Sequence, residues 1–145
     1  MWKKILIVVA LVAVIIQFFR IDKENPAYEP SNDFITVENA PEDIQIILEQ
    51  ACYDCHSHTT TYPWYSNIAP VSWWLKDHVD HGREHLNFSV WASYDAERRE
   101  HKLEELAEEV EKGEMPLDSY TWTHAESRLT DEQRKKLIDW ANSIR

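Results

Sequence analysis

The sequence predicts an all-α fold. Only two of the 145 residues are glycine, which argues against a turn-rich β-sandwich or barrel. Apolar residues recur at helical spacing in several segments, and nothing in the second half of the chain alternates like a strand for long. A chain of this length is sufficient for one compact domain with a single core.

Four helices are expected within residues 41–145. The first begins at Pro41, where a proline and two acidic residues suit the positive end of a helix dipole. The third ends at Gly113, a typical C-terminal stop, and the fourth begins at the capping box of Thr130 and Gln133. Helical periodicity predicts their approximate ranges as 41–51, 70–86, 95–112 and 130–144.

The N-terminal segment predicts export from the cytoplasm. Two lysines, Lys3 and Lys4, precede an apolar stretch over residues 5–16, and no small-residue cleavage signal follows it. Aromatic residues at both ends suit the two interfaces of a membrane. We therefore expect residues 1–21 to be an N-terminal membrane helix, in preference to a signal segment, with both lysines in the cytoplasm. Residues 22–40 then form a polar tether to a domain at 41–145.

The charge of the chain excludes one class of partner. Its formal net charge is −11, and no basic patch interrupts the acidic residues. A phosphate backbone would therefore be repelled, so we expect no nucleic acid to bind. The acidic helix of residues 97–114 could face a basic protein partner, although charge runs are most often solvated faces.

Both cysteines lie in one short motif, Cys52-Tyr53-Asp54-Cys55-His56. This is C-x-x-C-H, the spacing used for attachment of c-type haem. Thiols three residues apart on a helical turn face the same porphyrin edge, and the imidazole of the next residue lies beneath the iron. The motif predicts one covalently attached haem c held by Cys52 and Cys55, with His56 as the proximal iron ligand.

Three other roles for the cysteines stay open. A thioredoxin-like dithiol belongs near a βαβ pattern, which the sequence lacks. A zinc site would combine Cys52 and Cys55 with two histidines, for which His58 and His78 are the candidates. A structural disulfide across so short a loop would stabilise the fold little.

The sixth iron ligand is expected to be Met115. It is the only methionine besides the initiator, and it lies in the loop Gly113-Glu114-Met115-Pro116-Leu117 between two predicted helices. An electron-transfer cytochrome c presents its distal thioether in such a loop. His124 is the second candidate and His78 a third, since His78, His81 and His85 form a row on one helix, and an open distal site is the remaining alternative.

The walls of the haem pocket are predicted from aromatic residues near the motif. Tyr62, Trp64, Trp73 and Trp74 could line the haem, although ordinary core packing explains them equally well. Arg83 could pair with a haem propionate as a fork-shaped donor, against the alternative of an ordinary surface arginine.

Three stretches of the sequence resemble the bacterial haem-binding domain family, small anchored proteins with one C-x-x-C-H motif. They are "CYDCHSHTTTYPWYSNIAPVSWWL", "HVDHGREHLNFSVW" and "GEMPLDSYTWTHAESRLT", and the resemblance runs from about residue 45 to 144. It implies a monohaem c-type domain in which Cys52, Cys55 and His56 carry the haem. It supplies no substrate or partner, and Met115 rests on its position and on general similarity to cytochromes c.

Together these observations predict a small cytochrome c-like helical domain around one haem. Its expected function is single-electron transfer between redox proteins of the cell envelope, with the domain in the periplasm, anchored to the inner membrane, and with no catalytic residue. The first alternative is a haem-based sensor or a peroxide-reactive haem protein with an open distal site. The second is a structural module held by zinc.

Overall fold

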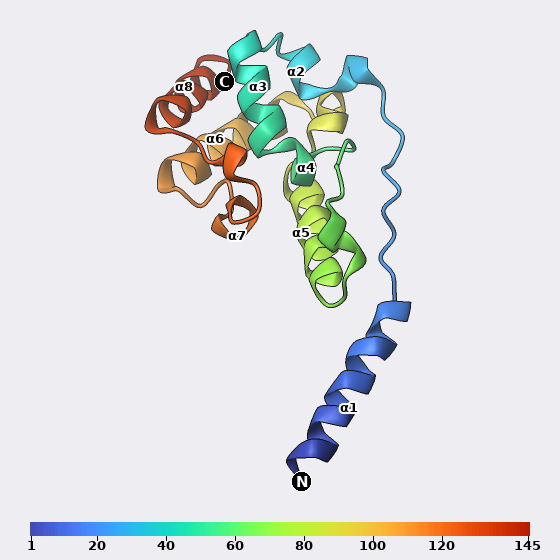
Figure 1. The fold of residues 1–145 in the computed structure, drawn as a ribbon. Coiled ribbons are helices and arrows are strands. Elements are labelled where there is room, and N and C mark those ends of the chain that lie inside the picture. Colours follow the sequence, from blue (N-terminus) through green and yellow to red (C-terminus); the bar gives the residue numbers. More distant parts are fainter.

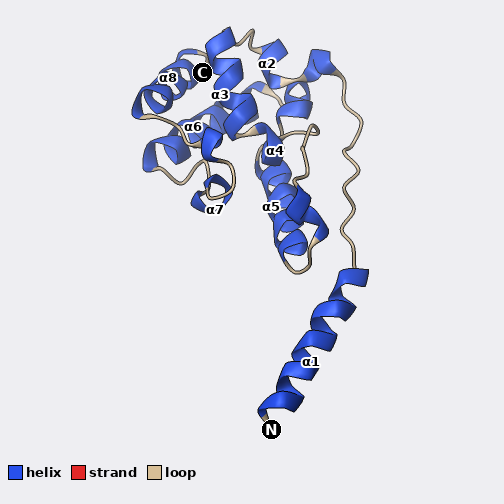
Figure 2. Ribbon diagram, viewed as in Figure 1, coloured by secondary structure: helices blue, strands red, loops and turns tan.

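The computed structural model describes all 145 residues, and it contains helices and loops but no strand (Figure 2). The all-α prediction is confirmed. Short 3₁₀ turns connect several of the helices. In chain order the α-helices are α1 (Trp2–Ile15), α2 (Phe34–Val37), α3 (Glu42–Ala51), α4 (Tyr53–His56), α5 (Val71–His85), α6 (Ala96–Lys112), α7 (Asp118–Thr121) and α8 (Asp131–Ser143).

The four helices expected in the second part of the chain correspond to α3, α5, α6 and α8. Gly113 ends α6 in the left-handed conformation, with φ of 79°, which a glycine adopts without strain. At the start of α8 the side chain of Thr130 accepts a hydrogen bond from the backbone of Gln133, whose side chain binds back to Thr130. These local signals give the observed helix ends because they satisfy backbone groups that a helix terminus leaves unpaired.

The core lies where α3, α6 and α8 pack together, beside the turn that follows α5 (Figure 1). Its centre is aromatic. Phe88 stacks on Phe34 at a centroid distance of 4.9 Å and on Tyr53 at 5.0 Å. Because Tyr53 belongs to the C-x-x-C-H motif, the motif is packed directly against the core.

The N-terminal helix is shorter than the sequence analysis expects. α1 has 14 residues, and a 3₁₀ turn at Ile16–Phe18 follows it. At 1.5 Å per residue it spans about 21 Å, whereas the hydrocarbon layer of a bilayer is about 30 Å thick. No helix in the structure has both the length and the apolar character needed to cross a membrane. The prediction of an N-terminal membrane helix is therefore wrong.

The segment between α1 and α3 runs in an extended form beside α5 and then folds onto the core (Figure 1). Asn25 fastens the extended part, because its side chain donates to the Thr60 carbonyl at 2.9 Å and accepts from Arg83 at 2.8 Å. Farther along, Phe34 is completely buried. Residues that the sequence analysis assigns to the tether thus contribute to the core.

Candidate haem site

A cavity of about 470 Å³ lies between the C-x-x-C-H motif, α5, α6 and the loop before α7. This volume falls in the range of small-molecule and cofactor sites, about 300–1,000 Å³. Half of its lining residues are hydrophobic. The cavity brings together all four side chains that the sequence analysis assigns to the haem, which are Cys52, Cys55, His56 and Met115.

The imidazole of His56 is held through its Nδ1 by the C-terminal end of α5 and the residue that follows it. Its Nδ1 lies 3.0 Å from the Gly82 carbonyl and 3.0 Å from the Leu86 carbonyl. Carbonyl oxygens only accept hydrogen bonds, so Nδ1 carries the proton and Nε2 is left with a free lone pair. Burial lowers the pKa of His56, which favours this neutral form. A neutral imidazole fixed through its second nitrogen is the arrangement of a metal-binding histidine.

Gly82 is required for this support because the turn of the C-x-x-C-H motif, residues 52–56, lies against its Cα. A Cβ at position 82 would lie 2.6 Å from the Cys55 carbonyl oxygen and 3.2 Å from the Cys55 Cβ. Ordinary contacts of a Cβ are longer than 3.4 Å. The helix range predicted from the sequence, 70–86, includes Gly82, and an isolated glycine inside a helix is a signal that could have indicated a packing role.

The two thiols are free and kept protonated. Burial, with a smaller contribution from the neighbouring thiol, raises the pKa of Cys52 to about 12. Burial and the Asp54 carboxylate raise the pKa of Cys55 to about 11. Redox-active dithiols instead have lowered pKa values, so this environment does not resemble a thioredoxin-like site.

The zinc alternative is not supported by the arrangement of side chains. No group of three or more histidine, cysteine, aspartate and glutamate residues is placed to hold a metal ion. The ring of His58 contacts Asn87, with Nε2 2.9 Å from the amide nitrogen, and Nδ1 of His78 lies 2.8 Å from the Trp74 carbonyl. The two proposed histidine ligands are thus bonded within their own neighbourhoods.

Met115 reaches the cavity through a loop that two elements hold. Its backbone N–H donates to the Glu109 carbonyl of α6 at 3.2 Å. From α8, the Arg134 guanidinium donates to the carbonyls of Val110 and Met115, the latter at 3.3 Å. Arg134 was not predicted as a site residue, because its position in the chain gives no indication of this contact.

Neither histidine candidate for the distal position, His124 or His78, is placed as Met115 is. His124 does not line the cavity. Its ring stacks on Tyr120 at a centroid distance of 4.3 Å, and its Nε2 lies 2.9 Å from the Tyr65 hydroxyl. His78 and His85 do line it, but they lie four residues before and three after Gly82, on the same face of α5. They therefore flank the support of His56, whereas Met115 comes from a different segment.

Asp54 connects the turn of the C-x-x-C-H motif to the segment that follows Met115. Its Oδ2 accepts a hydrogen bond from the Tyr120 hydroxyl at 2.8 Å, and its Oδ1 accepts one from the Thr61 N–H at 2.8 Å. Tyr120 also lines the cavity. One hydrogen bond thus joins the two parts of the chain that carry the proposed iron ligands.

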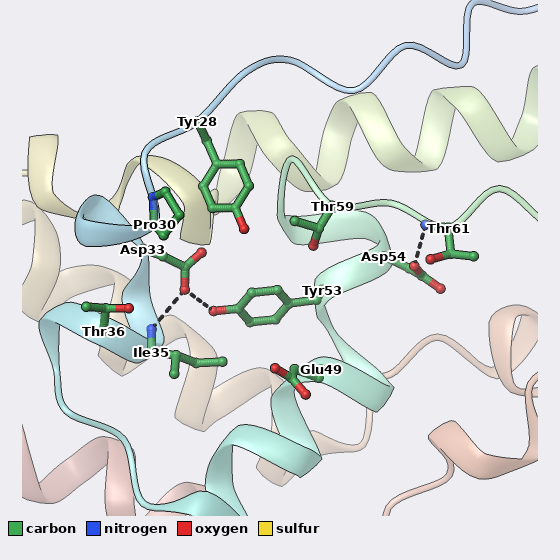
Figure 3. A pocket seen from close by; sticks show the side chains of 10 residues that line it. All are labelled: Tyr28, Pro30, Asp33, Ile35, Thr36, Glu49, Tyr53, Asp54, Thr59 and Thr61. Atoms are coloured by element: carbon green, nitrogen blue, oxygen red, sulfur yellow. Dashed lines mark hydrogen bonds between the residues drawn. The ribbon is translucent and has the colours of Figure 1, made fainter.

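The other central residue of the motif, Tyr53, is fixed from the opposite side by Asp33 (Figure 3). The Tyr53 hydroxyl donates to Asp33 Oδ1 at 2.6 Å, and the Ile35 N–H donates to the same oxygen at 3.1 Å. Burial raises the pKa of the Asp33 carboxyl, against the lowering effect of these hydrogen bonds. A second, more polar cavity of about 460 Å³ adjoins this pair.

The expected pocket walls differ from the observed ones. None of the four aromatic residues expected there lines the cavity, and the apolar walls include Phe88, Leu106 and Val110 instead. Trp64 is 75% exposed. Arg83 does not line the cavity either, because its guanidinium donates to Ser57, Asn25 and Thr60. Sequence position near the motif did not reveal which side chains face the cavity.

The residues around the cavity fit a haem. They offer a neutral imidazole with a free nitrogen, two protonated thiols, one thioether and partly apolar walls. Taken with the helical fold, they define a small haem-binding α-domain.

The model of the haem-binding domain family matches residues 11–143, and the chain belongs to this family. Searches of curated proteins and of solved structures found no match. The prediction that the chain is a haem-binding domain is confirmed by the family match.

Proposed function

We propose that this protein is a monohaem c-type cytochrome that carries single electrons and catalyses no reaction of its own. The observation that carries the proposal is the orientation of His56. The carbonyls of Gly82 in α5 and of Leu86 directly after it hold its Nδ1, while Cys52, Cys55 and Met115 line the same cavity.

Each of these residues has a distinct part in holding the cofactor, which supplies a one-electron iron couple when bound. The thiols of Cys52 and Cys55 would each hold the haem through a C–S bond to a vinyl carbon, with the thiol hydrogen added to the adjoining carbon, so attachment would need no oxidant. His56 offers Nε2 to the iron, and Met115 offers its thioether. Methionine ligation raises the reduction potential relative to ligation by two histidines.

The proposed setting is the cell envelope, with redox proteins as partners. Attachment of c-type haem in bacteria takes place outside the cytoplasm, so the domain would be exported. A basic redox protein would be attracted to the exposed acidic side chains of α6, and such attraction speeds encounter. The most exposed of these acidic residues are Glu97, Glu100, Glu108 and Glu111.

Optical spectra of the protein made with haem-maturation machinery test this proposal. We expect a c-type spectrum that survives denaturation in the wild type. The Cys52→Ala and Cys55→Ala variants should each keep one thioether bond, and the double variant should release its haem on denaturation. Loss of haem from denatured wild-type protein would contradict covalent attachment.

The distal ligand and the electron-carrier role are tested on the same material. With Met115 on the iron, the oxidised protein shows a sulfur-to-iron charge-transfer band, and the reduced protein binds carbon monoxide slowly. Rapid carbon monoxide binding by the native reduced protein would contradict the electron-carrier proposal and favour a haem-based sensor. Stoichiometric zinc without haem would contradict both.

A further inference from the structure

Lys102 stands out among the charged residues that line the haem cavity. The lining contains three carboxylates, from Asp77, Glu105 and Glu109, but only one residue that is a lysine or arginine. The propionates of a haem would add two further negative charges to an already acidic cavity.

The side chain of Lys102 is also unusually buried. It is 14% exposed, whereas the side chain of Lys112 on the same helix is 54% exposed and that of Lys135 is 75% exposed. Lysine is rarely buried unless its ammonium group has partners. The ammonium of Lys102 has one partner in the structure, Glu105, at 2.5 Å.

An ammonium group has three donors, so Lys102 can hold Glu105 and accept a second carboxylate at the same time. The arginine expected to bind a propionate does not face the cavity, since Arg83 is engaged by Ser57, Asn25 and Thr60. Lys102 is therefore the only lysine or arginine side chain of the lining that can donate to a carboxylate inside the cavity.

We propose that Lys102 binds a haem propionate and thereby keeps this carboxylate ionised. The inference rests on haem binding and does not require the covalent attachment proposed above. An opposite charge within about 4–6 Å lowers a carboxyl pKa by about one to three units. Replacing Lys102 with a neutral residue should raise the propionate pKa by a similar amount.

The test is an NMR titration of the haem-loaded protein with ¹³C-labelled propionate carboxyls. Lys102→Gln should raise the pKa of one propionate, and Lys102→Arg should restore it. Glu105→Gln should lower it, because the ammonium loses its competing carboxylate. Lys135→Gln is the matched control, as it removes an exposed lysine of α8 that pairs with Asp139 and neither residue lines the cavity, so it should change nothing.

Other titrating groups that line the cavity are the same in the Lys102 and Lys135 variants, so they cancel in the comparison. They are Asp77, His78, His81, His85, Glu105, Glu109 and Tyr120. Equal propionate pKa values in wild type, Lys102→Gln and Glu105→Gln would overturn the inference, and so would a protein that binds no haem. Haem bound without covalent attachment would contradict the proposed cytochrome, while the Lys102 result would still be read from the titration.

Discussion

Substitution of Gly82 by alanine tests whether α5 supports the turn of the C-x-x-C-H motif, residues 52–56. The new Cβ would lie 2.6 Å from the Cys55 carbonyl oxygen, so the two segments must separate by roughly 0.8 Å to reach the ordinary contact distance of 3.4 Å. The atom it meets is backbone, which cannot move aside as a flexible side chain would. Overpacking of this kind costs about 1–3 kcal/mol, while alanine gains about 1 kcal/mol of helix propensity over glycine.

We take the upper part of the overpacking range because backbone meets backbone, and we expect Gly82→Ala to lower the free energy of unfolding by about 1–2 kcal/mol. Separation of α5 from the turn also lengthens the His56 hydrogen bonds to Gly82 and Leu86. Chemical denaturation of haem-loaded and haem-free protein measures the first effect. The yield of attached haem and the reduction potential measure the second.

Gly113→Ala is the matched control, since it makes the same chemical change at the only other glycine. No atom lies within 4 Å of a Cβ there, but the positive φ costs about 1–2 kcal/mol. It should lower stability without reducing the yield of attached haem. An alanine at position 82 that raises stability by about 1 kcal/mol and leaves the haem unchanged would refute the close contact, because helix propensity alone would then decide the outcome.

Three further predictions follow from the contacts of the site. Met115→Ala should lower the reduction potential, abolish the sulfur-to-iron band and open the iron to carbon monoxide; an unchanged spectrum would remove Met115 from the site. Tyr120→Phe loses the hydrogen bond to Asp54 and should cost about 0.5–1.5 kcal/mol of stability. It should also weaken the sulfur-to-iron band on warming, whereas Tyr65→Phe should leave that band intact. Because burial raises the pKa of Asp33, wild-type stability falls as pH rises from the ordinary carboxyl pKa through the raised one. The unfolding free energy of Asp33→Asn should therefore increase relative to wild type over that interval, and parallel pH curves from denaturant titrations would contradict this.

Much of the fold was predictable because the signals for helices are local. The periodicity and end signals of α3, α5, α6 and α8 lie within each segment, and the structure confirms them. The prediction of an N-terminal membrane helix was wrong because it too rested on a local signal. Its composition resembles a membrane helix, but its helix ends at Ile15, and hydropathy does not report where a helix ends.

The spacing of Cys52, Cys55 and His56 is a property of one helical turn, so the sequence alone indicated a haem site. The position of Met115 between two helices indicated a loop residue, and the structure brings it to the cavity that the motif lines. These inferences needed no knowledge of contacts between distant segments.

Only the tertiary structure showed what surrounds that motif. The support from Gly82 and Leu86, the hold of Arg134 on the Met115 loop and the burial of Lys102 all depend on helix packing. Packing also decided that the expected tryptophans lie outside the cavity. Sequence by itself therefore determined the helical fold class and indicated a haem site at the C-x-x-C-H motif, because both depend on patterns within a few residues. The walls, the support and the charge of the cavity arise where segments far apart in the chain meet, and no local pattern encodes such meetings.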